Sequence, residues 1–239
     1  MASDPALLVP PTLDREETSR YVIRARPRRM FHTVLDAADL VDPQRPGSSS
    51  TTTRVFREGG RARLEFSTEQ KLRSGTLVES LLCDADGGLV ARRFERTMTD
   101  DTGVETRHER ADFGRGPVHL PRDTYPEVCL PFLLRWQPFD RTRRSVHAWI
   151  ADRMVARVYY EVSGRSTIDV PAGRFDVWDV LMYPDLNDWV KLPRIVADLG
   201  KPFMPKYHMA YELRAPNRLV RFEGPYGPPG APELVLELA

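Results

Sequence analysis

The sequence predicts a mainly β protein, built on a large curved antiparallel sheet or an open or closed β-barrel, with one or two short covering helices. Three observations predict this class. Charged and apolar residues alternate with period two through most of residues 20–182 and 206–238. Glycine-containing turns separate the alternating segments, with no 15-residue amphipathic helix between them. One apolar segment, between Pro121 and Pro138, fits no strand alternation.

The chain length allows a single large domain. The chain has 239 residues, and all-β barrels and sandwiches of 200–250 residues form one unit. Residues 1–19 contain three prolines and predict an extended N-terminal arm. We therefore expect an arm over 1–19 and one barrel-like domain over 20–239.

The first strands follow from alternation and turns. In residues 20–26, Tyr21, Ile23 and Ala25 alternate with arginines, as a strand with one solvated face requires. Residues 43–53, a Pro/Gly segment and then a Ser/Thr run, predict a flexible loop entering a strand. Hairpin turns are predicted at the end of these and the following strands, at residues 58–61, 84–88 and 100–103.

The later elements follow the same reasoning. Residues 126–136 are dense in large apolar groups and predict one or two short helices packed on the sheet, with proline in an N-terminal turn. Residues 184–205 are irregular, with a short helix at 192–199. The remaining strands are expected at residues 145–150, 154–162, 168–170, 175–182, 206–213, 218–223 and 234–238, with a turn at 171–173.

Charge and motifs exclude several functions. With 35 basic and 34 acidic residues the net charge is +1, which disfavours a general nucleic-acid binder. The sequence has no GxGxxG, Walker A or GxSxG pattern, and its five histidines form no metal-binding motif. We therefore expect no cofactor and no metal site, and composition does not reveal the oligomeric state.

The location is predicted from the N-terminus and the cysteines. The first residues contain no basic n-region, and nowhere do 18 apolar residues run together, so no membrane span is expected. Cys83 and Cys129 lie in apolar runs and are expected to be buried reduced thiols. These features predict a cytoplasmic protein.

A family resemblance rests on the C-terminal half. Its strongest part is residues 167–176, TIDVPAGRFD, which form a strand, a P-A-G-x-F turn and a return strand. Residues 123–182, with a weaker likeness at 206–238, resemble the DUF3108 family of bacterial proteins of unassigned function. The resemblance implies a curved antiparallel sheet akin to periplasmic lipoprotein carriers, closed around an apolar interior. It implies no catalytic residues.

The predicted function is that of a cytoplasmic protein whose apolar cavity binds a hydrophobic small molecule, lipid or polyketide-like. A curved sheet of this size commonly encloses a ligand site, covered here by residues 124–136 and 184–205. Plain core packing explains the same aromatic residues. The predicted ligand-binding residues are Tyr125, Phe132, Leu133, Trp136, Trp149, Tyr160, Trp178 and Tyr211.

Two alternatives remain open. The first is an enzyme of secondary metabolism on the same scaffold, a cyclase, isomerase or hydrolase that uses the cavity to shape its substrate. Its candidate acid–base groups are His147, His208, Asp185 and Asp188, although a structural histidine or a solvated loop is the favoured explanation of each. The second alternative is a protein-interaction module that uses the Pro-rich segment near the C-terminus.

Overall fold

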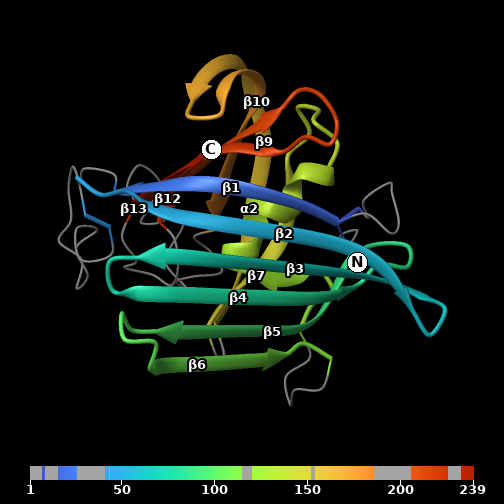
Figure 1. Cartoon of the computed structure of the whole chain (residues 1–239). Helices are drawn as coiled ribbons and strands as arrows, with labels where there is room; N and C mark the ends of the chain where they lie inside the picture. The colour runs from blue at the N-terminus through green and yellow to red at the C-terminus, as the bar shows by residue number, and fades with distance from the viewer. Residues whose placement is uncertain are drawn as a thin grey trace, which may run out of the picture.

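The computed structural model describes residues 7–8, 16–25, 41–42, 44–114, 120–151, 154–185, 206–225 and 233–239. In these parts of the chain, thirteen strands form a single sheet in the order β6-β5-β4-β3-β2-β1-β13-β12-β11-β10-β9-β8-β7 (Figure 1). Every neighbouring pair is antiparallel except β7 and β8, which are parallel. The predicted mainly β fold with a large curved antiparallel sheet is confirmed.

The strands before the apolar segment follow one another along the sheet. They are β1 (Glu16–Ala25), β2 (Gly47–Glu58), β3 (Arg61–Leu72), β4 (Gly75–Asp84), β5 (Val90–Thr99) and β6 (Glu105–Asp112). The predicted turns at 58–61, 84–88 and 100–103 join β2 to β3, β4 to β5 and β5 to β6. Residues 16–19 of the predicted arm belong to β1.

The second half of the sheet begins with a short strand and a buried helical segment. These are β7 (Thr124–Pro126), the 3-10 turn η1 (Glu127–Cys129), the short helix α2 (Leu130–Leu133) and the 3-10 turn η2 (Leu134–Trp136). The strands that follow are β8 (Arg144–Ala151), β9 (Met154–Val170), β10 (Gly173–Pro184), β11 (Tyr207–Glu212), β12 (Leu219–Pro225) and β13 (Glu233–Leu238).

Residues 124–136, which we call the inner segment, consist of the terminal strand β7 and the helical residues 127–136, which lie on one face of the sheet. Figure 1 shows α2 behind β1 to β3. The Phe132 ring packs 5.1 Å from that of Phe66 on β3 and 5.9 Å from that of Tyr21 on β1. The other strands bend around the helical part of this segment because it provides apolar surface against which their inward-facing residues are buried.

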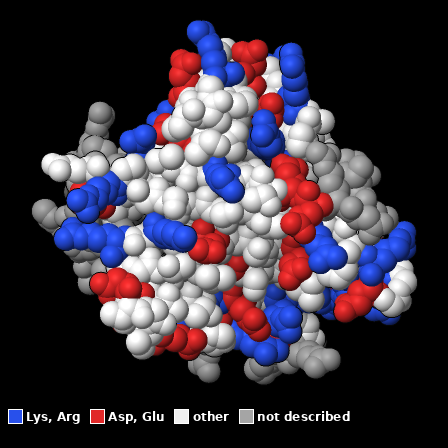
Figure 2. All heavy atoms as spheres, viewed as in Figure 1, with Lys and Arg blue, Asp and Glu red and all other residues white. Residues whose placement is uncertain are grey.

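The opposite, outer face of the sheet carries the polar half of the alternation. Figure 2 shows acidic and basic side chains interleaved over the face made by β1 to β6. Arg63 pairs with Glu58 and Asp84, and Arg110 with Glu95. Among the described residues in this view, no large patch of a single sign stands out, as expected for a solvated strand face.

Side-chain contacts connect the strands near the two ends of the sheet. The backbone pairing of the described strands does not close the sheet into a barrel. The Trp149 ring of β8 lies 5.7 Å from that of Phe94 on β5 and 5.8 Å from that of Phe113. The Tyr125 hydroxyl donates a hydrogen bond to the Leu89 carbonyl and accepts one from the Leu7 amide. The sheet is therefore open, and aromatic side chains fill the space between its two ends.

The turn that carries the family-like motif lies at the tip of the β9–β10 hairpin. Gly173 has φ +128°, a positive value that favours glycine, although it lies outside the narrow αL well. A Cβ on Gly173 would meet no atom within 4 Å. A substitution there therefore tests backbone conformation without a steric clash.

Gly173→Val is expected to lower the free energy of unfolding by about 1–3 kcal/mol, because a β-branched residue is strained at this φ. The measurement is the urea midpoint at unchanged m-value. Ala172→Val, one residue earlier in the same exposed turn, is the matched control and should change stability little. Equal midpoints for Gly173→Val and the parent protein would contradict the prediction.

Candidate functional site

The predicted ligand-binding residues form the core of the molecule. Six of them are at most 6% exposed, and Trp136 and Trp178 are partly buried. Those that are at most 6% exposed are Tyr125, Phe132, Leu133, Trp149, Tyr160 and Tyr211. The apolar segment predicted as a cover over a cavity is therefore the filling of the sheet's interior. Sequence alone could not distinguish these roles, because a cover and a core segment have the same composition.

Hydrogen bonds fix the inner segment to strands on both sides. The Tyr211 hydroxyl of β11 donates to the Pro131 carbonyl at 2.6 Å. The Arg135 guanidinium donates to the Glu17 carboxylate at 2.9 Å and to the Pro216 carbonyl at 2.8 Å. Because the Arg135 side chain is only 8% exposed, this ion pair is largely removed from solvent.

An acidic group of the inner segment is also buried. Glu127 is 9% exposed and accepts a hydrogen bond from the Tyr207 hydroxyl. Burial raises the pKa of Glu127 to about 7, against the opposing effects of Tyr207 and of the Arg96 charge. The same burial raises the pKa of Tyr207 well above its ordinary value. Glu127 is thus a proton-binding group inside the core, one that sequence reasoning did not select.

A row of polar residues crosses the inner face of β1 to β6. Strand register places each of these residues opposite the next one on the neighbouring strand, so that they lie on one line across six strands. Their order is Ser19, Thr51, Thr68, Glu79, Arg96 and Glu109. Arg96 lies 2.8 Å from Glu79 and 3.3 Å from Glu109, and Glu79 is fully buried. This buried ion network neutralises most of the charge that the row brings inside.

The Ser/Thr run that predicted a flexible loop contributes to this row. β2 begins at Gly47, so residues 47–53 are strand and the predicted loop is wrong there. Ser49, Thr51 and Thr53 point inward and are buried. The signal in the sequence was the alternation of these hydroxyl residues, which pair with inward-facing residues of β3.

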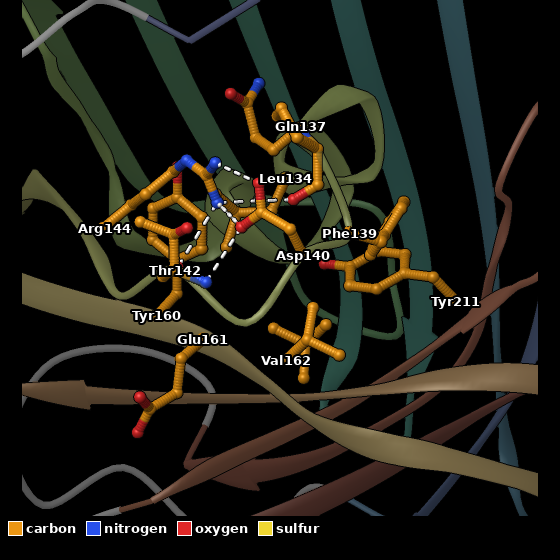
Figure 3. Close-up of a pocket in the computed structure, with 12 residues that line it drawn as sticks. Leu134, Gln137, Phe139, Asp140, Thr142, Arg144, Tyr160, Glu161, Val162 and Tyr211 are labelled. Carbon is orange, nitrogen blue, oxygen red and sulfur yellow. Dashed lines mark hydrogen bonds and ion pairs between the residues drawn. The ribbon is translucent and has the colours of Figure 1, made fainter.

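The half-enclosed pocket beside η2 is small. Figure 3 shows Phe139 and Tyr211 on one side and the Arg144–Asp140 ion pair on the other. Its free volume of about 10 Å³ has room for one water molecule. Phe139 continues into a stack with Trp178, 5.8 Å away, so aromatic packing occupies most of this region.

A larger groove lies on the outer face of β9 to β12, with a volume of about 350 Å³. Register places Gly164, Asp179, Ala210 and Arg221 side by side across the four strands. Because Gly164 and Ala210 have little or no side chain, the sheet is hollowed between their longer neighbours. The other residues that line the groove are Ser163, Ile168, Val180, His208, Met209 and Glu223.

The charges of this groove are unevenly matched. Arg221 pairs with Glu223 and lies 3.8 Å from Glu237. Asp179 Oδ1 accepts a hydrogen bond of 2.9 Å from the Ser166 hydroxyl, and its Oδ2 lies beside Gly164. Two carboxylates, of Asp179 and Glu223, thus face one guanidinium among the lining residues. His208, a predicted candidate, lies directly across from Glu223.

Two of the other predicted acid–base residues lie on β8 and just after the end of β10. His147 Nδ1 is 2.9 Å from Asp123 Oδ1, and the Asp185 carboxylate accepts a hydrogen bond from Tyr159. Arg157 lies between His147 and Asp185, so the three residues form a row. His208 is lined up with neither. Asp188 lies outside the described residues, and general-base roles for the others stay predictions.

Cys83 and Cys129 are buried free thiols, as predicted. Burial raises the pKa of Cys83 to about 12 and that of Cys129 well above its ordinary value, so both stay protonated at neutral pH. Within the described ranges, no group of three or more His, Cys, Asp or Glu side chains could hold a metal ion. No helix in that part of the chain is both long and apolar enough to cross a membrane.

The solved structures that match the chain include two distant ones, described below. No family model matches the chain, and no curated protein does. A "putative exported protein with YmcC-like fold" from Bacteroides fragilis is 10% identical, covers 98% of this chain and 97% of its own, and has a TM-score of 0.35. A "putative lipoprotein" from Parabacteroides distasonis is 12% identical, covers 98% of both chains, and has a TM-score of 0.30.

These matches contradict the predicted function and location. Their descriptions name an exported protein and a lipoprotein, and neither describes a cytoplasmic protein that binds a hydrophobic small molecule. That prediction is wrong by this comparison and is withdrawn. The prediction of a cytoplasmic location rests on the N-terminal residues and the cysteines alone. The predicted cyclase, isomerase or hydrolase also loses its basis, because the inner segment fills the interior that was to shape a substrate.

Proposed function

We propose that the outer groove of β9 to β12 recognises a basic side chain of a partner polypeptide. The observation that carries this proposal is an excess of carboxylate beside the hollow at Gly164 and Ala210. The partly exposed Ile168 provides apolar surface for the aliphatic stem of a lysine or arginine, which packs along such surface while its charged end stays hydrated. Asp179 and Glu223 supply acceptors for the ammonium or guanidinium group.

The affinity of this groove for a single side chain should be low. The carboxylates are partly exposed, and an exposed ion pair contributes about 0–1 kcal/mol. Even two such pairs, at about 2 kcal/mol together, correspond to a dissociation constant of tens of millimolar or weaker for an isolated lysine side chain. A partner presenting several basic residues would bind more tightly through added contacts beyond the groove.

The first test is titration of the isotope-labelled protein with Nα-acetyl-lysine amide, followed by amide NMR shifts. We expect shifts at Asp179, Ala210 and Glu223, and no such shifts with the norleucine analogue, which has the stem without the charge. Asp179→Asn should weaken binding about 3–5-fold by removing one acceptor charge. Equal binding of the norleucine analogue would refute recognition of a basic group.

Two further variants sharpen the test. Asp176→Asn is the matched control, because Asp176 is on the same strand and also accepts a hydroxyl hydrogen bond, from Thr167, but lies outside the groove. It should bind the lysine probe like the parent protein. Gly164→Leu should block binding, because a Cβ there would lie 3.8 Å from Asp179 Oδ2 and the larger side chain would fill the hollow. Unimpaired binding by Gly164→Leu would place the probe elsewhere.

We also propose that the chain belongs to the DUF3108 family. The proposal is supported by the β9–β10 hairpin, whose turn coincides with the P-A-G-R-F motif, and by the curved antiparallel sheet. A profile built from homologues of this chain would test it. Alignment of that profile with the family over residues 123–182 is the expected result, and alignment confined to the turn would contradict it.

A further inference from the structure

β6 is the terminal strand of the sheet, and within the described residues no strand pairs with its second edge. Figure 1 shows it as the outermost of these strands. Six of its eight residues are exposed. An exposed edge strand carries unpaired backbone groups that can form a ladder with another strand. The side chains of β6 determine which strand can pair with this edge.

The pairing of β6 with β5 determines which backbone groups point outward. The Phe113 amide donates to the Arg92 carbonyl, next to the Asp112–Arg93 pair. Along an antiparallel strand, every second residue forms its backbone hydrogen bonds with the same neighbouring strand. Ala111, Glu109 and Arg107 therefore also direct their amides toward β5. The outward-facing amides and carbonyls are therefore those of Thr106, His108, Arg110 and Asp112.

Among the antiparallel registers that pair most of the strand, the charge pattern of β6 is complementary to itself in one. With a two-fold axis through His108, Arg107 of each copy lies opposite Glu109 of the other, and Thr106 lies opposite Arg110. An axis through Arg107, Glu109 or Arg110 would instead set like charges against each other, which is destabilising. The register at His108 also sets outward-facing backbone groups of the two copies against each other, as a hydrogen-bonded pair requires.

We propose that β6 pairs antiparallel with β6 of a second copy of this chain about a two-fold axis at His108, joining two sheets edge to edge. The charges of β6 would repel many other strands but match in this register, so they select the partner. A single eight-residue strand buries little surface, which places the dimer among weak, concentration-dependent interfaces. The groove of β9 to β12 is not involved.

The experiment is sedimentation velocity over a series of protein concentrations. The parent protein should shift from monomer toward dimer as concentration rises. His108→Pro removes the outward amide without removing a backbone hydrogen bond to β5, and should weaken the dimer about a hundredfold or more. Like His108→Ala, it loses the side-chain hydrogen bond to Thr97. His108→Ala keeps the amide and is the matched control, so it should still dimerise. A parent protein that stays monomeric at the highest attainable concentration overturns the proposal.

A charge pair at one exposed position keeps the test valid if His108→Pro fails to fold. Thr106→Glu sets a carboxylate opposite Arg110 twice per dimer and should tighten dimerisation several-fold, whereas Thr106→Arg sets like charges there and should weaken it about tenfold. Both variants lose the same hydrogen bond from Thr106 to the Met98 carbonyl. Equal dimerisation of the two variants would show that any dimer uses another surface.

Discussion

Phe132→Ala is expected to lower the free energy of unfolding by about 3–5 kcal/mol, because it opens a cavity in the middle of the core. Phe132 is 4% exposed and contacts Tyr21 and Phe66, which belong to two different strands. The inner segment has only one short helix of its own, so it depends on such contacts for its position. Urea unfolding followed by tryptophan fluorescence measures the change.

Phe56→Ala is the matched control for this prediction. Phe56 lies on the outer face of β2, is only partly buried, and contacts Arg54. The same chemical change there removes less packed surface and should cost roughly 1 kcal/mol. If Phe132→Ala costs no more than Phe56→Ala, the inner segment is not packed as the core of the sheet.

Glu127→Gln is expected to stabilise the protein at alkaline pH and to leave its stability nearly unchanged in acid. Burial raises the pKa of Glu127 from 4.5 to about 7, so between these values the folded protein holds a proton that the unfolded chain has released. Stability therefore falls as pH rises from about 4.5 to 7, and stays lower above that range. The rise of about 2.5 pKa units corresponds to about 3 kcal/mol.

Glutamine imitates the neutral acid and can still accept the hydrogen bond from Tyr207. The difference between Glu127→Gln and the parent should thus grow from near zero below pH 4.5 to about 3 kcal/mol above pH 7. Chemical unfolding at a series of pH values measures it, with Glu65→Gln on the exposed face of β3 as the control. If the stability difference between Glu127→Gln and the parent does not vary with pH, burial does not raise the pKa of Glu127.

Local sequence was enough to predict the strands and turns. The alternation of Tyr21 and Ile23 with arginines is decided by neighbouring residues, and so is the reversal at residues 58–61. The same holds for the positive φ of Gly173, which a strand–PAG–strand sequence requires. These features depend on backbone geometry within a few residues, and neighbouring residue types determine that geometry.

The candidate sites were predicted less well, because they depend on which strands become neighbours. His208 was selected as a titratable residue, but the groove it lines is made by Gly164, Asp179 and Arg221, which are far from it in sequence. Glu127 was overlooked because its unusual pKa comes from burial and not from sequence neighbours. The polar row from Ser19 to Glu109 is visible only when six strands are placed in register.

The sequence by itself determined that this protein is a mainly β chain with one apolar segment among its strands. Only the tertiary structure decided that residues 124–136 fill the interior instead of covering a cavity, because filling and covering use the same residue types. It also decided that the open groove lies on the outer face and that β6 ends the sheet. Strand order and register are set by contacts between residues far apart in the chain. The free energies of these contacts cannot be deduced from the pattern of neighbouring residues.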